Sequence, residues 1–154
     1  MELSDLASIA EIIGLVALVP SLIYVGLQIR TGNRETRAAT IQSTLSSEME
    51  MIAVLTENAA VWDKVVTGEP LSDGVETRKG ILLFKLFMTD SENWYLQFKA
   101  GFLESQVWES RLGVLPELAS LPIFESWRPT LGARNHSADF LELLDNLADR
   151  ASDV

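Results

Sequence analysis

The feature that most constrains the fold is an uncharged apolar run near the N-terminus. Residues 12–27 read IIGLVALVPSLIYVGL and contain no charged side chain. Taken from Ile9 to Ile29, the segment would form a helix about 31 Å long, which matches a hydrocarbon core of about 30 Å. A buried core helix is the alternative, but a domain this small could hardly surround a helix that is apolar on every face. The run therefore predicts a single transmembrane helix.

Basic residues lie on one side of the run only. The N-terminal flank holds Glu2 and Asp5 but no lysine or arginine, and it lacks a small-residue cleavage pattern, so a cleaved signal peptide is disfavoured. The positive-inside rule places the flank rich in basic residues, and the chain that follows it, in the cytoplasm. The residues that would set this orientation are Arg30, Arg34 and Arg37. We expect an anchor over residues 1–32 and a cytoplasmic domain over residues 33–154.

Small and polar residues recur within the predicted anchor at alternating spacings of three and four. Such a stripe is typical of a helix-packing seam, because small side chains let two helices approach closely in lipid and polar ones add hydrogen bonds between them. Glu11 lies beside this seam, where an intramembrane carboxylate would be a candidate functional group, although a place at the outer interface explains it equally well. The seam consists of Ala7, Ala10, Gly14, Ala17, Ser21, Tyr24 and Gln28.

The residues after the anchor predict one small acidic helical domain. They hold few prolines and show helical rather than alternating apolar periodicity, which favours an all-α bundle. Residues 34–67 contain neither glycine nor proline, so they predict one long helix, which either begins at an Asn33 cap or continues directly from the membrane helix. Its expected buried stripe consists of Ile41, Leu45, Ile52, Leu55, Ala59, Trp62 and Val66.

Local signals place the remaining helices. Ser72 or Asp73 can cap a helix that ends near Gly101, and a shorter one follows over residues 104–114. Pro116 and Pro122 each suit the first turn of a short helix, the second covering residues 123–131. After a loop over residues 132–136, Ser137 is expected to cap the last helix. The four tryptophans all lie on apolar helix faces, so we expect them in the core.

No pattern in the sequence predicts catalysis, a metal site or a cofactor. There is no cysteine, no glycine-rich phosphate loop and no serine-centred elbow, and carboxylates two residues apart on a helix point to different sides. The single histidine, His136, has no nearby ligand partner and is expected to be a solvated loop residue. Glu92 lies on the apolar side of its helix and predicts a buried acceptor for Lys85, Lys99 or an arginine. We expect a protein that is not an enzyme.

The charge balance argues against nucleic-acid binding. The chain carries 12 basic and 22 acidic residues, and three of the basic residues lie at the end of the apolar run. An acidic domain repels phosphate backbones, and no basic stripe interleaved with aromatic residues is present. The partners that the sequence predicts are the lipid bilayer and other copies or other membrane proteins.

Two stretches resemble a known family. Residues 11–42, EIIGLVALVPSLIYVGLQIRTGNRETRAATIQ, and residues 92–145, which include ENWYLQFKAGFLESQVWESRLGVLPELASLPIFESW, are similar to the ends of a family of short bacterial membrane-anchored proteins without assigned function. The resemblance implies a bacterial origin, an inner-membrane anchor and a helical cytoplasmic domain. It implies no activity and brings no catalytic residues.

Two functions are consistent with these features. The first is a non-enzymatic membrane component whose anchor packs against copies of itself or a larger complex and whose helical domain binds a protein. The second is an oligomeric pore or transport element with Glu11 and Gln28 near the path. A membrane-anchored enzyme is a more distant third reading, and the stoichiometry of the assembled protein would distinguish the first two.

Overall fold

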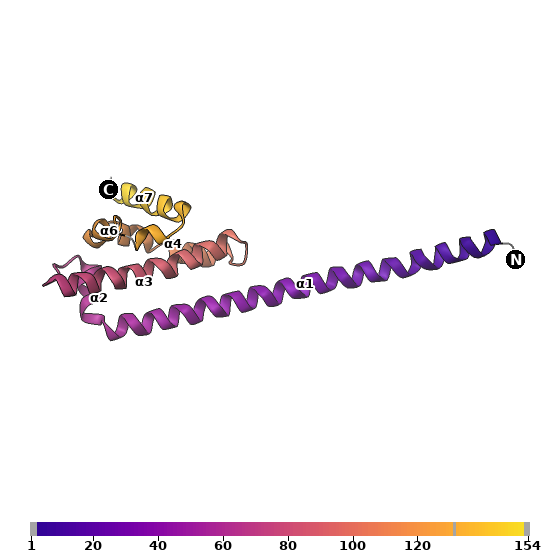
Figure 1. Ribbon diagram of the computed structural model, residues 1–154, viewed down its shortest axis with the longest axis horizontal. Helices are drawn as coiled ribbons and strands as arrows, with labels where there is room; N and C mark the ends of the chain where they lie inside the picture. The colour runs from indigo at the N-terminus through magenta and orange to yellow at the C-terminus, as the bar shows by residue number, and fades with distance from the viewer. Residues whose placement is uncertain (1–2, 131, 153–154) are drawn as a thin grey trace. The chain divides into compact units, whose positions relative to one another are not determined.

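All the regular structure that we describe is helical, as the sequence predicts. The computed structural model describes the backbone of residues 3–130 and 132–152, and the side chains of residues 16, 18–130 and 132–150. The helices are α1 (Leu3–Glu57), α2 (Ala59–Thr67), α3 (Gly74–Lys99), α4 (Ser105–Leu112), α5 (Leu115–Ala119), α6 (Pro122–Trp127) and α7 (Ala138–Ser152), with a 3-10 turn η1 (Ala133–Asn135) before α7 (Figure 1).

The chain divides into two compact units, Met1–Ala39 and Thr40–Val154. The first unit is the N-terminal part of α1. In the part of the chain that the structure describes, no helix is both long enough and apolar enough to cross a membrane. The predicted span is Ile9–Ile29, and the side chains at its start lie outside the described residues. The side chain of Glu11 is one of these.

The core of the second unit is built around α3, which contacts α2, α4 and α6, while α5 packs against α7. Phe84 and Met88 of α3 are fully buried at its centre. The other fully buried large side chains come from α5, α6 and α7, namely Leu115, Trp127, Phe140 and Leu144. A second, smaller apolar cluster joins Met51 and Leu55 of α1 to Leu83 of α3. Together these contacts hold residues 40–57 of α1 against the bundle.

The tryptophans lie in this core, as predicted. Trp94, Trp108 and Trp127 are buried, and Trp62 packs partly buried against them. Trp108 stacks on Phe98 with ring centroids 5.8 Å apart. Aromatic pairs of this kind contribute about 0.5–1.5 kcal/mol beyond the burial of their area.

The helix ends that depend on local signals are also as expected. The side chain of Asp73 accepts hydrogen bonds from the backbone N–H groups of Val75 and Glu76, both at 2.8 Å, and so caps α3. After α3, Gly101 adopts a left-handed φ of 76°, which costs glycine little. Prolines 116 and 122 occupy the first turns of α5 and α6.

Three details of the predicted helices are wrong. The long helix predicted over residues 34–67 breaks at Asn58, because the Asn58 side chain donates to the carbonyl of Val54 at 2.7 Å and competes with the helical hydrogen bonds. The short helix predicted over residues 123–131 ends at Trp127. The hydroxyl of Ser137 is buried without a hydrogen-bond partner, so it does not cap α7.

The buried face of α1 also differs from the prediction. Leu55 is buried as predicted, but Ile41, Leu45 and Ile52 are 39%, 49% and 45% exposed. Thr44 and Met51, which were not in the predicted stripe, are buried instead. The helix is rotated because Ser47 and Glu48 turn toward a polar cluster on α3 and α4.

Candidate functional site

The most unusual surface of the first unit is formed by large apolar side chains that are exposed. Their exposed fractions lie between 49% and 67%. Four successive residues, Leu22 to Val25, belong to the set, and positions 100° apart on a helix cover its whole circumference. Apolar surface of this extent marks a site of contact with a membrane or a protein. The set consists of Val16, Leu18, Val19, Leu22, Ile23, Tyr24, Val25, Leu27 and Ile29.

Part of the predicted packing seam lies on this apolar segment. Gln28 donates from Nε2 to the hydroxyl of Tyr24 at 2.9 Å, one turn back along the helix. Ser21 is exposed on the same helix. The other four members of the seam, Ala7, Ala10, Gly14 and Ala17, lie outside the residues with described side chains. The seam therefore stays a prediction.

The three arginines that follow the apolar segment are exposed and line one hollow. Arg30, Arg34 and Arg37 surround a volume of about 470 Å³ together with Leu27, Thr31 and Asn33. Within the described residues, these guanidinium groups form no ion pair. The three arginines predicted to set the orientation thus line the same hollow on the surface of α1.

The second unit contains a buried polar cluster around Arg111 that the sequence analysis did not predict. Arg111 of α4 is only 8% exposed. Its Nη2 pairs with Oδ2 of Asp90, its Nη1 lies 3.3 Å from Oε1 of Glu48, and its Nε donates to the Ser91 hydroxyl at 3.2 Å. Ser47 of α1 completes the cluster by donating to Asp90 at 3.2 Å. These contacts tie α1, α3 and α4 together.

The electrostatics of this cluster are dominated by burial. Burial raises the pKa of Asp90, and the positive charge of Arg111 opposes that change. Burial likewise lowers the pKa of Arg111, opposed by Asp90 and Glu48. The guanidinium also lies over the Phe87 ring, 4.4 Å from its centroid. Each polar group is thus paired inside the bundle, which is the arrangement of a structural ion pair rather than of a group that reacts with a ligand.

His136 and Glu92 form a second buried pair. Nδ1 of His136 lies 2.6 Å from Oε2 of Glu92, and the backbone N–H of Ser137 donates to Oε1 of Glu92 at 2.6 Å. The His136 ring also contacts Trp127, with centroids 5.4 Å apart. Glu92 is therefore an acceptor, as predicted, but its partner is neither a lysine nor an arginine. The prediction that His136 is a solvated loop residue is wrong.

No metal site emerges from these pairs. The described residues hold no group of three histidine, aspartate or glutamate side chains placed to bind an ion. Neither buried pair could be found from sequence spacing, because 44 residues separate Glu92 from His136 and 21 separate Asp90 from Arg111. The place of Glu92 on the apolar side of its helix was a signal for one of these pairs, but it did not identify the partner.

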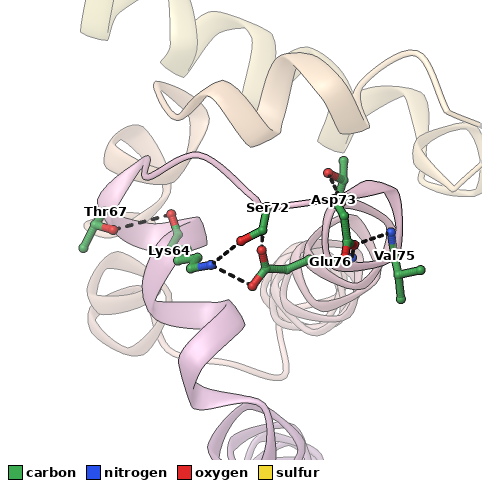
Figure 2. A network of polar contacts seen from close by, with 7 residues as sticks. Lys64, Thr67, Ser72, Asp73, Val75 and Glu76 are labelled. Atoms are coloured by element: carbon green, nitrogen blue, oxygen red, sulfur yellow. Dashed lines mark hydrogen bonds and ion pairs between the residues drawn. The ribbon is translucent and has the colours of Figure 1, made fainter.

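A third polar cluster joins α2 to the start of α3 (Figure 2). Nζ of Lys64 lies 2.8 Å from Oε1 of Glu76 and donates to the Ser72 hydroxyl at 3.1 Å. The hydrogen bond from Lys64, followed by that from the Ser72 backbone, lowers the pKa of Glu76 to about 2. This cluster fixes the turn between the two helices and lies at the surface.

The second unit also has an apolar surface of its own. Leu45, Met49 and Ile52 are exposed on α1 at spacings of four and three. Their stripe leads into a hollow of about 660 Å³ where α1 meets α2, lined mainly by Ile52, Leu55, Thr56, Trp62 and Val66. This stripe and hollow form the candidate surface for a protein partner.

No protein-family model, curated protein or solved structure is significantly similar to this chain. The resemblance of residues 11–42 and 92–145 to short bacterial membrane-anchored proteins therefore stays a prediction.

Proposed function

We propose that this chain is a non-enzymatic membrane component. Its N-terminal segment, Ile9–Ile29, anchors it in a bacterial inner membrane and packs there against copies of itself or a larger complex, and its helical domain binds a protein on the cytoplasmic side. The exposed apolar side chains of α1 between residues 16 and 29 are the observation that carries this proposal.

The energetic reason is the cost of leaving these side chains in water. Burying one large apolar side chain gains about 1.5–3 kcal/mol, so nine that are each roughly half exposed represent on the order of 10 kcal/mol. A bilayer can cover all sides of a helix at once, whereas one protein partner covers one face. Because apolar residues occupy every side of this segment, lipid fits it better.

The orientation follows from the charges that flank the segment. Arg30, Arg34 and Arg37 lie at its C-terminal end, and the sequence before it holds no basic residue. Because arginine is retained on the cytoplasmic side, this asymmetry supports a cytoplasmic second unit.

The second unit supplies the surface for a protein partner. Leu45, Met49 and Ile52 are spaced as the apolar residues of a helix–helix interface, and the adjoining hollow could take an inserted side chain.

Membrane extraction tests the anchor. The full-length chain should stay in the membrane pellet after alkaline wash and should require detergent for release. The double variant Leu22→Lys/Ile23→Lys should move to the soluble fraction, because two lysines near the centre of a span cost about 5–7 kcal/mol. The matched control, Val75→Lys/Val114→Lys, changes two exposed residues of the second unit and should stay in the pellet. A wild-type chain that is soluble without detergent would refute the anchor.

Association through the anchor has its own test. Gly14→Ile should weaken self-assembly in detergent by about 1 kcal/mol, because a branched side chain separates two packed helices. Val16→Ile, on another face, should assemble like the wild type. Native mass spectrometry gives the stoichiometry of both variants, and equal assembly of the two would remove the seam from the proposal.

A further inference from the structure

We propose that Arg30, Arg34 and Arg37 form a binding site for the phosphate of an anionic lipid headgroup. The inference rests on the proposed anchor and adds a specific ligand to it. The positive-inside rule needs only net charge near the membrane, whereas a site needs charges that converge on one place.

The three arginines converge because of their spacing along α1. Positions 30, 34 and 37 differ by four and seven residues, so at 100° per residue they fall within about 60° of one another around the helix axis. Their side chains line the same hollow of about 470 Å³. That volume exceeds the space that a single phosphate group needs.

The charge of this hollow is not neutralised by the protein. Glu35 is the one acidic residue between positions 16 and 39, and it lies about 140° around the helix from Arg30. In the second unit, by contrast, Arg128 forms two hydrogen bonds of 2.8 Å to Asp145. The first-unit arginines have no such carboxylate among the described residues, so their donors can bind an external anion.

The chemistry of the lining matches a phospholipid rather than a free anion. Guanidinium groups present paired N–H donors that fit phosphate oxygens. Thr31 and Asn33 add neutral hydrogen-bonding groups beside them, suited to a headgroup hydroxyl. Leu27 lies on the other side of the hollow and continues the exposed apolar segment, along which acyl chains can run. A charged end and an apolar end on one helix are complementary to a phosphatidylglycerol molecule.

Energy transfer in vesicles measures this selectivity directly. The chain has no cysteine, so Ala39→Cys provides a unique site for a donor dye two residues beyond Arg37. The labelled full chain is reconstituted into phosphatidylcholine vesicles that contain a small fraction of acceptor-labelled phosphatidylglycerol or acceptor-labelled phosphatidylcholine. General attraction of one arginine to an anionic surface is worth about 1 kcal/mol, or about fivefold, so a site built from three converging arginines should enrich phosphatidylglycerol by more than that ratio.

Two variants separate the site from general charge. Arg30→Gln/Arg34→Gln/Arg37→Gln should abolish the enrichment. The exchange Arg34→Thr/Thr36→Arg keeps the net charge beside the anchor but moves one arginine about 160° around the helix, so it should lose most of the enrichment as well. Enrichment that survives the first variant, or that the exchange leaves unchanged, would overturn the proposal.

The remaining outcomes are equally decisive. If sodium chloride and sodium phosphate of the same ionic strength abolish the enrichment equally, it reflects unspecific attraction between charges and the proposed site is overturned, whereas stronger competition by sodium phosphate would support recognition of the phosphate group. If the chain enters both kinds of vesicle but shows no enrichment, the lipid site is refuted while the anchor stands. If it enters neither, the anchor itself has failed.

Discussion

Arginines and large apolar residues are buried in one unit of this chain and exposed in the other. In the second unit, Arg111 is buried and paired with Asp90 and Glu48, and large apolar side chains close around one another. Among the described residues of the first unit, the arginines are exposed and form no ion pair, and large apolar side chains face outward on every side. The apolar side chains of the second unit shield one another from water. Those of the first unit do not, so only a membrane or a partner protein can shield them.

The contrast shows that apolar content alone does not identify a core. Met49 and Met51 are two residues apart in α1, yet Met49 is 66% exposed and Met51 is 4% exposed. What separates them is the side of the helix that carries Ser47 and Glu48 to their partners on α3 and α4. The buried apolar residues of α1 and its polar pairs with α3 and α4 thus both face the bundle.

The largest effect should come from removing a ring in the second unit. Trp108 is 5% exposed and contacts both Tyr95 and Phe98. Trp108→Ala should destabilise the unit by about 3–5 kcal/mol through the cavity it leaves. Denaturant unfolding of the detergent-solubilised chain, followed by far-UV circular dichroism, measures this loss. An unchanged melting temperature with loss of a copurifying protein would instead make Trp108 an interface residue.

Replacing an arginine in each unit sharpens the comparison. Arg111→Ala leaves the buried Asp90 without its cation and should cost about 3–5 kcal/mol in the same measurement. Arg34→Ala removes an exposed arginine and should change the unfolding free energy by less than about 0.5 kcal/mol. Similar losses in the two variants would break the distinction between the units.

The two methionines of α1 give a smaller effect on a single helix. Met51→Ala should destabilise the second unit by about 2–4 kcal/mol, because it removes a side chain packed against Leu83. Met49→Ala should be nearly neutral for unfolding but should weaken binding of any partner to the exposed stripe. If Met49→Ala is the more destabilising change, the assigned rotation of α1 is wrong.

The smallest effect concerns pH. The pKa of Glu76 is lowered from 4.5 to about 2, so the ionised form favours the folded state. Its contribution is complete above pH 4.5 and is lost as the pH falls toward 2. Glu76→Gln should therefore flatten the dependence of unfolding free energy on pH in this window only. A difference from the wild type that instead grows as the pH falls would contradict the ion pair with Lys64.

Local chemistry explains which parts of the fold could be predicted. The cap at Asp73, the stop at Gly101 and the prolines of α5 and α6 act within a few residues, so the sequence around them is sufficient. The break at Asn58 could not be predicted, because an asparagine can either continue a helix or interrupt it by binding a backbone carbonyl with its side chain. The sequence does not show which of the two occurs. The side of α1 that is buried could not be predicted from apolar periodicity, because that pattern contains no information about the hydrogen bonds of Ser47 and Glu48 to other helices.

The candidate site was predicted only where it is continuous in sequence. The apolar segment and its three arginines follow one another along the chain, so their association required no tertiary information. The pair of Glu92 and His136 joins residues from separate helices, and neither residue has a neighbour in sequence that reveals the other.

The contact between Glu48 and Arg111 has a consequence for the chain as it is being made. The two residues are 63 positions apart. At about 5–20 residues per second, a ribosome needs roughly 3–13 s to reach the second after the first. Throughout this interval Glu48 has no cation to pair with, and the neighbouring Met51 and Leu55 have at best an incomplete surface to pack on. The C-terminal part of α1 therefore needs protection from aggregation until α3 and α4 have been made.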